Sequence, residues 1–260
     1  MNLQLRDKVV LITGGAKGIG GACARALSEE GATSVIVDRD AEAGEKLRQE
    51  LLSAGARCLL VTADLTSPER CAQSVEYAMK EFGQLDALLN NAGVNDRIGL
   101  EHGSPEQYVG SLQRNLLHYY NMAHYALPHL KRSKGSIVNI ASKTAITGQG
   151  GTSGYASSKG AVLALTREWA VELLPYEIRV NAVVPAEVMT PLYRQWLATF
   201  PNPDSKLTTI TSKIPLGNRM TGADEIAAMV VFLMSARAGH VTGQHIFVDG
   251  GYVHLDRALS

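Results

Sequence analysis

The sequence lacks the features of a disulfide-stapled, zinc-binding or membrane-spanning protein. Its three cysteines, Cys23, Cys58 and Cys71, are odd in number and show no CxxC or Cys/His spacing, which argues against a disulfide framework and a zinc motif. The longest apolar run, at 227–234, is far shorter than the ~20 residues that cross a bilayer. The opening MNLQLRDKVV has no signal-like apolar segment. We therefore expect a cytoplasmic protein with no membrane partner and no metal site.

A surplus of charge of either sign is also absent. Lys plus Arg and Asp plus Glu number 25 each, so no net field attracts a nucleic acid, and we expect no nucleic-acid partner. With 45% hydrophobic residues in a chain of 260, there is enough apolar material for a substantial core, and the length does not require a second domain. We predict a single domain over residues 1–260.

Short β-branched segments alternate with stretches of helical period along most of the chain. The strand candidates are residues 8–13, 33–38, 56–64, 85–91, 135–142, 178–185 and 244–250. The helix candidates are residues 18–30, 41–54, 67–82, 105–133, 154–174 and 223–235. This alternation predicts an α/β fold, with a doubly wound parallel sheet of about seven strands and helices on both faces. Ligands of such sheets bind beyond the carboxyl ends of the strands.

One segment, residues 186–218, breaks the alternation. It contains Pro191, Pro201, Pro203 and Pro215 and is too irregular for one simple crossover. Because it follows a strand, it lies at the edge of the sheet where ligands bind. We predict that it forms a lid over a substrate pocket.

The first strand is followed by the glycine-rich sequence TGGAKGIG, before a helix. Gly14 permits a tight turn, Gly18 lets the backbone approach a pyrophosphate, and Gly20 permits close packing of helix on strand. The helix N-terminus supplies N–H groups and the positive end of a dipole. The GxxxGxG spacing differs from the usual GxGxxG pattern, and a plain glycine turn is the alternative. We assign the loop, with Lys17 and Ile19, to a dinucleotide site.

Asp38 ends the second strand, where a carboxylate accepts both hydroxyls of an adenosine ribose and repels the 2′-phosphate of NADP. Arg39 and Lys17 are cations that offset this repulsion. We therefore predict NAD or NADP as the cofactor, with NAD at least tolerated. The alternative for Asp38 is a surface turn aspartate.

Two further strand ends extend the predicted dinucleotide site. Asp64 and Leu65 follow the third strand, where they would contact an adenine or simply lead into the next helix. The sequence NNAG follows the fourth strand, and its small residues let the chain pass close to a ribose. The alternative is that its asparagines join neighbouring strands through side-chain hydrogen bonds. From this segment we assign Asn91, Ala92 and Gly93 to the site.

Tyr155 and Lys159 lie four residues apart in SGYASSKGAV. On a helix, this spacing places the phenol and the ammonium on the same face. A cation ~4 Å from a phenol, at an effective dielectric constant of ~20, contributes ~4 kcal/mol, or about three pKa units. Tyr155 would then act as a base near neutral pH. On spacing alone, an ordinary solvated helix face is the commoner outcome.

Two more polar residues fall at positions where they can reach this pair. Ser142 ends the fifth strand, so its hydroxyl is placed to donate to a substrate oxygen. Asn115 lies in the long predicted helix, where it would hold a water beside Lys159. Taken singly, these are a strand-end serine and a polar helix residue.

The ordered set of TGGxxGIG, NNAG, Asn115, Ser142 and YxxxK resembles the short-chain dehydrogenase/reductase family across essentially the whole chain. The resemblance implies a Rossmann fold and hydride transfer to or from a nicotinamide. It also implies a catalytic set of Ser142, Tyr155, Lys159 and Asn115. Cofactor contacts implied in the same way involve Tyr155, Lys159, Pro185, Val188 and Thr190.

The sequence departs from the family after the sixth strand, where Pro-Gly is usual and Ala186 and Glu187 follow Pro185. The lid and the tail VDGGYVHLDRAL are most similar to the L-fucose dehydrogenases, a sugar-oxidising branch. This implies oxidation of the anomeric hydroxyl of L-fucose or a related pyranose to a 1,5-lactone, with tyrosine as the base. Candidate substrate residues are Asn95, Ser142, Lys143, Gln149, Tyr155, Glu187 and Trp196.

Other functions stay open on these residues. For the candidate sugar contacts, the alternatives are ordinary loop polarity and, for Trp196, packing of the lid. The catalytic set also serves dehydrogenases of steroids, acyl groups and simple alcohols, and a non-catalytic dinucleotide sensor would keep the same fold.

The apolar sequence GQHIFVDGGY is predicted to form a sheet edge that pairs subunits in a homodimer or homotetramer.

Overall fold

The computed structural model describes residues 2–255, in which seven parallel strands form one sheet in the order β3-β2-β1-β4-β5-β6-β7. The strands are β1 (Val9–Thr13), β2 (Thr33–Asp38), β3 (Cys58–Thr62), β4 (Ala87–Asn90), β5 (Ser136–Ile140), β6 (Arg179–Pro185) and β7 (His245–Val248). The order reverses between β1 and β4, which is where ligands of doubly wound sheets bind. Residues 256–260, which end the predicted tail sequence, lie outside the described part.

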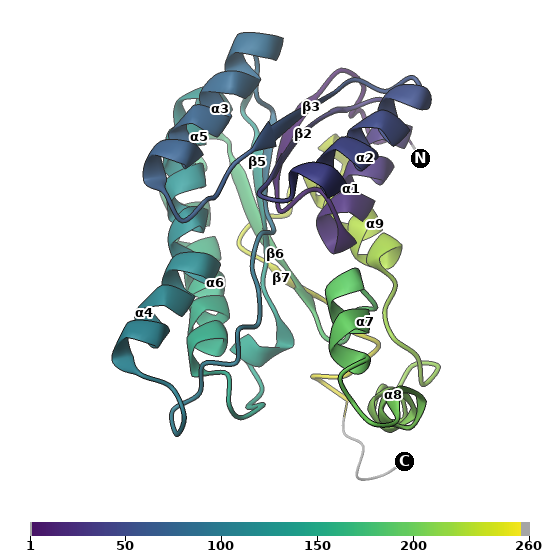
Figure 1. Cartoon of the computed structure of the whole chain (residues 1–260). Helices are drawn as coiled ribbons and strands as arrows, with labels where there is room; N and C mark the ends of the chain where they lie inside the picture. Colours follow the sequence, from purple (N-terminus) through teal and green to yellow (C-terminus); the bar gives the residue numbers. More distant parts are fainter. Residues whose placement is uncertain (1, 256–260) are drawn as a thin grey trace.

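Helices cover both faces of the sheet, as predicted (Figure 1). One face carries α1 (Gly18–Glu29), α2 (Ala41–Ser53) and α9 (Ala223–Met234). The other carries α3 (Pro68–Phe82), α5 (His118–Ser133) and α6 (Ser153–Glu172). The prediction of a seven-stranded Rossmann fold is confirmed, while the single domain over residues 1–260 stays a prediction.

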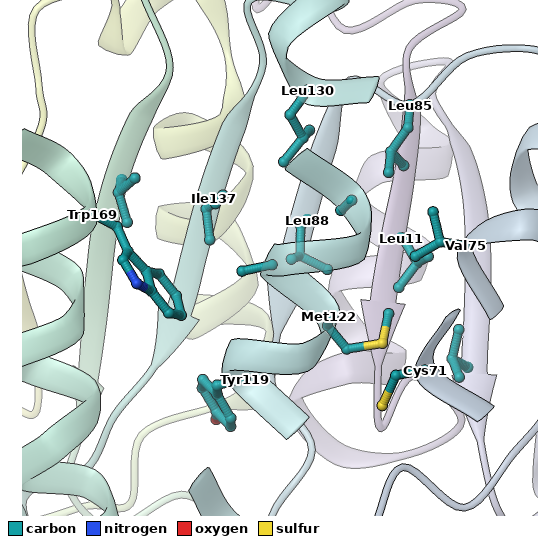
Figure 2. Close-up of a cluster of buried hydrophobic side chains, with 14 of the residues drawn as sticks. Leu11, Cys71, Val75, Leu85, Leu88, Tyr119, Met122, Leu130, Ile137 and Trp169 are labelled. Carbon is teal, nitrogen blue, oxygen red and sulfur yellow. The ribbon is translucent and has the colours of Figure 1, made fainter. Parts of the chain in front are cut away.

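The period of two along β1 explains why the sheet buries both faces. Val9 and Leu11 belong to the cluster under α3, α5 and α6, and Val10 and Ile12 to the cluster under α1 and α9. Figure 2 shows the first cluster, in which Leu11 lies with the side chains that α5 sends toward the sheet. Full burial of such a side chain stabilises the fold by ~1.5–3 kcal/mol. The four residues therefore fix β1 between the two helical layers.

The helix predicted over residues 105–133 is interrupted. It consists of α4 (Pro105–Leu112), a π-helical segment η1 (Gln113–Leu117) and α5. Pro105 starts α4 and a Ser104–Gln107 capping box closes its first turn. The π-helical segments of proteins frequently mark functional sites, and this one contains Asn115.

The predicted lid is more regular than its prolines suggested. It contains α7 (Pro191–Leu197) and α8 (Pro203–Thr211), and both helices begin at a proline. Proline is favoured at the first helical position because its missing N–H would have no partner there. Both helices lie beside one end of the sheet, away from the β3 edge (Figure 1). Their function as a lid stays a prediction.

Within residues 2–255, every helix is too short or too polar to cross a membrane. The cytoplasmic location and the oligomer stay predictions.

Candidate active site

The glycine loop between β1 and α1 has the close approaches that its sequence predicted. Gly14 has a φ of +61°, and a Cβ there would lie 2.9 Å from Ala92 Cα. A Cβ on Gly20 would lie 2.2 Å from the Gly14 carbonyl oxygen, so helix and strand pack too closely for any side chain. Gly18, with a φ of +56°, faces Thr190, since its Cβ would lie 3.3 Å from Thr190 Cγ2. Ile19 is half-buried against the core under α1.

Asp38 joins this loop to the end of β2. Its carboxylate accepts hydrogen bonds from the Ala16 N–H at 3.0 Å and from the Asp40 N–H at 3.0 Å. Lys17 is paired with Asp40, which also caps α2 by accepting from Ala43 N. The Lys17 ammonium and the capping N–H hold the pKa of Asp40 below its ordinary value. Lys17 therefore already has a carboxylate partner, which the sequence did not indicate.

The residues after β3 form the turn that leads into α3. Asp64 is exposed and accepts from both the N–H and the hydroxyl of Thr66, at 3.0 and 2.9 Å, which forms the turn before α3. These bonds lower the pKa of Asp64. Leu65 is 7% exposed and belongs to the core under α3. Its side chain packs into the core, and its predicted contact with an adenine stays a prediction.

The NNAG segment joins neighbouring strands, and also approaches the glycine loop. Asn91 Nδ2 donates to the carbonyl oxygens of Thr13 at 2.9 Å and Gly14 at 3.0 Å. Asn90 Nδ2 donates to Asn139 Oδ1 on β5 at 3.1 Å, and Asn139 donates to Thr166 on α6 at 3.0 Å. The asparagines therefore join neighbouring strands, and the close approach of this segment to a ribose stays a prediction. The chain of amides also fixes α6, which carries Tyr155 and Lys159, against the sheet.

Tyr155 lies in the first turn of α6 and is half-buried. α6 comes close to α4 because Gly154 has no side chain: a Cβ there would lie 2.4 Å from Ser111 Oγ. Ser142, 7% exposed after β5, accepts hydrogen bonds from the N–H and the hydroxyl of Thr144 at 3.3 and 3.1 Å. Its own hydroxyl hydrogen remains available for the Tyr155 phenol or for a substrate oxygen.

The pKa of Tyr155 is shifted upward, whereas the sequence predicted a downward shift. Burial raises the pKa of this phenol above its ordinary value, and the neighbouring Ser142 hydroxyl opposes that rise. Lys159 Nζ lies 5.6 Å from the centroid of the Tyr155 ring. Attraction to a cation lowers the pKa of a phenol, but the loss of water around the buried Tyr155 phenol favours the neutral form.

Lys159 is 2% exposed, and burial lowers the pKa of its ammonium to about 7. Its Nζ donates to the Tyr119 hydroxyl at 2.8 Å and to the Ile140 carbonyl oxygen at 2.8 Å. Tyr119 was not among the predicted site residues, because a tyrosine on the apolar stripe of a helix is typical of core packing.

Asn115 is fully buried and its amide is engaged by the protein. Its Oδ1 accepts from Val94 N at 2.7 Å, and its Nδ2 donates to the Ser111 carbonyl oxygen at 3.1 Å. Asn115 and Lys159 meet around Gly93, where a Cβ would lie 3.1 Å from Asn115 Oδ1 and 3.5 Å from Lys159 Nζ. The side chain therefore holds the loop after β4 next to Lys159. Its predicted water stays a prediction.

A second buried cation follows Ser142. Lys143 forms an ion pair with Glu187, and the two side chains are 9% and 14% exposed. Tyr193 on α7 donates to the other oxygen of Glu187 at 2.7 Å, and Lys143 Nζ lies 4.1 Å from the centroid of the Tyr252 ring. Burial and the Glu187 carboxylate raise the pKa of Tyr193, so its hydroxyl stays a donor. The structure thus brings together Lys143 and Glu187, and adds Tyr193 and Tyr252.

The remaining predicted substrate residues differ in placement. Trp196 on α7 is half-buried, and the Arg97 guanidinium lies 5.6 Å from the centroid of its ring. This contact joins the loop after β4 to α7. Asn95 accepts from Arg97 N at 3.3 Å, as an ordinary loop residue does, and Gln149 is exposed. The structure gives no contact that places Gln149 with the others.

The segment after β6 faces the glycine loop. Pro185 ends β6, and Val188 is buried and bridges to Thr221. Thr190 caps α7 by accepting from Tyr193 N at 3.2 Å. Ala186 has no left-handed backbone, so the missing glycine leaves no strain at that position. Thr190 and Gly18 together border the space between α1 and α7.

Comparison with known proteins identifies the family. Residues 14–253 match the family model described as enoyl-(acyl carrier protein) reductase. The chain is 38% identical over 245 residues to the L-fucose dehydrogenase of Oryctolagus cuniculus, which covers 94% of this chain and 84% of the relative. The chain belongs to the short-chain dehydrogenase/reductase family. It is therefore an NAD(P)-dependent oxidoreductase that acts on CH–OH groups.

Other members show how broad this family is. The chain is 35% identical over 252 residues to 3-oxoacyl-(acyl-carrier-protein) reductase FabG of Thermotoga maritima. The alignment covers 96% of this chain and 100% of that relative. It is also similar to the solved structure of the Cj0485 dehydrogenase, with a TM-score of 0.97 and 46% identity over 100% of this chain and 99% of that chain. Family membership therefore establishes the reaction class but not the substrate.

The residues present fit a nicotinamide dinucleotide. Gly14 and Gly18 adopt left-handed backbone that only a glycine loop tolerates easily, and a side chain on Gly93 would crowd Lys159. The loop leads into the N-terminus of α1, whose free N–H groups suit a pyrophosphate.

Proposed function

We propose that this dehydrogenase oxidises the anomeric hydroxyl of L-fucose or a related pyranose to the 1,5-lactone. The observation that carries the proposal is the buried cluster of Lys143, Glu187 and Tyr193, in which Lys143 follows Ser142 directly in the chain. The similarity to an L-fucose dehydrogenase supports the same substrate class.

The chemistry of this cluster suits a substrate with several hydroxyls. A carboxylate offers about four lone-pair positions, and Glu187 uses two of them for Lys143 and Tyr193. The hydroxyls of a sugar can supply the remaining donors and accept from the Lys143 ammonium. An apolar steroid or acyl chain would cover these groups without bonding to them, at a cost of ~1–3 kcal/mol for each group left unsatisfied. Trp196 would offer an apolar face to the methyl group of a 6-deoxy sugar.

Each proposed catalytic residue has one task in this reaction. The Tyr155 phenolate takes the proton of the C1 hydroxyl, and Ser142 donates a hydrogen bond to the same oxygen. As the C1–O double bond forms, C1 loses a hydride, and the ring oxygen shares the developing positive charge. Lys159 stabilises the phenolate, and Asn115 holds the adjoining loop. The chemistry supplied by a bound nicotinamide is acceptance of the hydride and a positive charge near the phenol.

The cofactor would lie along the carboxyl ends of the strands. We assign its pyrophosphate to the glycine loop, its adenosine ribose to Asp38, and its nicotinamide half to Thr190 and Gly93. We also propose that α7 and α8 form the lid. Trp196 of α7 lies against Arg97 after β4, and Tyr193 of α7 donates to Glu187, which pairs with Lys143 after β5.

A substrate panel tests the proposal. The protein is incubated with NAD or NADP and L-fucose, D-arabinose or a hydroxysteroid, and with the reduced cofactors and a 3-oxoacyl thioester. We expect reduction of the cofactor with L-fucose or another pyranose and release of a lactone. If no pyranose is turned over, the sugar assignment is wrong.

The same panel separates the alternatives. Turnover of the thioester alone would favour an acyl reductase, which the similarity to FabG keeps open. Binding of the cofactor with no turnover of any substrate would favour a dinucleotide sensor. Tyr155→Phe is the control: it should abolish turnover while preserving the affinity for the cofactor.

A further inference from the structure

The buried Tyr119 hydroxyl, the Lys159 ammonium and the Ile140 carbonyl oxygen form a closed triangle of hydrogen bonds. Lys159 Nζ donates to Tyr119 Oη at 2.8 Å and to the Ile140 carbonyl oxygen at 2.8 Å. Tyr119 Oη donates to the same carbonyl oxygen at 2.9 Å. The Tyr119 hydroxyl therefore accepts one hydrogen bond and donates another, which uses both of its functions. Tyr119 is fully buried on α5, and Figure 2 shows it in the core cluster.

The surroundings of Lys159 make the Tyr119 hydroxyl important. The two oxygens that accept from Nζ are both neutral, and within residues 2–255 no carboxylate bonds to this ammonium. The titratable groups that face it are Tyr155 on its own helix, and Tyr119 and His118 on α5. Burial lowers the pKa of His118 to about 4, so His118 is neutral near pH 7. Dipoles alone thus hold the charge of Lys159.

We propose that Tyr119 is a positioning residue that acts through Lys159, by fixing the ammonium between the end of β5 and Tyr155. An ammonium has three donors. Two of them are used by the triangle, so the third can serve the cofactor or a water. Without the Tyr119 hydroxyl, only the Ile140 carbonyl would hold Nζ, and the charged form of Lys159 would lose one of its two acceptors. The proposal depends on the family reaction and not on the identity of the substrate.

The decisive measurement is the titration of Lys159 by NMR in protein carrying isotope-labelled lysine. Lys159→Met identifies the resonance by its loss. Tyr119→Phe removes one oxygen and keeps the ring, and we expect the Lys159 midpoint to fall by about one to two pH units. An unchanged midpoint in a folded Tyr119→Phe protein overturns the proposal. No substrate is required, so a failed sugar panel does not affect this result.

Tyr125→Phe is the matched control, because Tyr125 lies on the same helix, is half-buried against the same core cluster and takes no part in the triangle. Its Lys159 midpoint should equal that of the wild type. An equal shift in both variants would show a general effect of the core and would overturn the specific assignment. Circular dichroism and thermal unfolding establish that both variants are folded.

Turnover supplies a second readout once a substrate is found. Because the reaction requires Lys159 to be charged, the alkaline limb of kcat/KM against pH should move to lower pH in Tyr119→Phe by the same one to two units, roughly. A role limited to packing would lower the whole profile without moving that limb.

Discussion

Two buried lysines lie near Ser142, and their neighbours differ. Lys143 forms an ion pair with Glu187 and lies against the ring of Tyr252. Lys159 is held by the Tyr119 hydroxyl and the Ile140 carbonyl oxygen, and burial lowers its pKa to about 7. A charge compensated by a carboxylate is fixed, whereas a charge held only by dipoles is available to another group. The first region is therefore suited to anchoring a substrate, and the second to stabilising a phenolate.

The strongest test of this comparison is Lys159→Met. Removing the cation leaves the buried Tyr155 phenol without its stabilising partner, so the base form becomes rarer at neutral pH. We expect kcat to fall by roughly 10²–10⁴-fold. Because Lys159 is also an expected cofactor contact, the Kd of the cofactor is measured separately by fluorescence, and kcat is compared at saturating cofactor. If kcat stays within a few fold of the wild type, Lys159 does not assist the base and the two lysines have the same role.

Glu187→Gln tests the anchoring region. The substitution keeps the shape but removes the charge, so the Lys143 ammonium stays buried without its partner. We expect the KM for the sugar to rise about 10–100-fold, with a smaller change in kcat and none in the KM of the cofactor. Steady-state kinetics measure all three.

Glu225→Gln is the matched control for that variant. Glu225 pairs with Arg219 at the surface, where the side chains are 39% and 56% exposed. Exposed pairs contribute little, so its kinetics should match the wild type. An unchanged KM for the sugar in Glu187→Gln would show that the ion pair serves the fold and not the substrate.

The elements of the fold were predictable because each depends on local sequence. The β-branched runs gave strands such as Thr33–Asp38 at their observed bounds, and the glycines of the first loop predicted its left-handed turns. The π-helical segment at Gln113–Leu117 was not predicted, since the sequence indicated one continuous helix over 105–133; in the fold, this segment and α4 both pack against α6. The same packing depends on Gly154 and Ser111, which lie on different helices.

A candidate site could be proposed from the sequence where residue types carry the chemistry. Ser142, Tyr155 and Lys159 are recognisable by their order and spacing. Tyr119, Tyr193 and Tyr252 were missed as site residues, because each meets its charged partner only after the chain folds. The pKa of Tyr155 was predicted in the wrong direction for the same reason: the spacing to Lys159 is visible in the sequence, but the loss of solvent is not.

The free energy of unfolding should also depend on pH through Lys159. Lys159 has a folded pKa of about 7, below the ordinary lysine value of 10.5, so the unfolded chain binds more protons between these values. The buried charge therefore lowers the free energy of unfolding by its full amount below pH 7, and this destabilisation decreases as the pH rises toward 10. Lys159→Met should be more stable than the wild type at pH 6, by roughly 1–3 kcal/mol, and the difference should shrink by pH 9. Denaturant unfolding at both pH values measures it, and a constant difference would contradict the lowered pKa.

The smallest expected effect is on the choice between NAD and NADP. Lys17 is paired with Asp40 in a largely exposed ion pair, whose side chains are 52% and 37% exposed. Asp40 already compensates this cation, so Asp38 should decide between the cofactors. We expect Asp38→Ala to raise the ratio of kcat/KM for NADP to that for NAD about tenfold, since the repulsion of a 2′-phosphate is removed. Asp86→Ala is the control. Asp86 likewise accepts from a backbone N–H, that of Val9 at 2.9 Å, and pairs with Lys8, but it lies at the opposite end of the strands. Its cofactor ratio should equal that of the wild type. An unchanged ratio in Asp38→Ala would mean that Asp38 does not contact the ribose and only ties the glycine loop to β2.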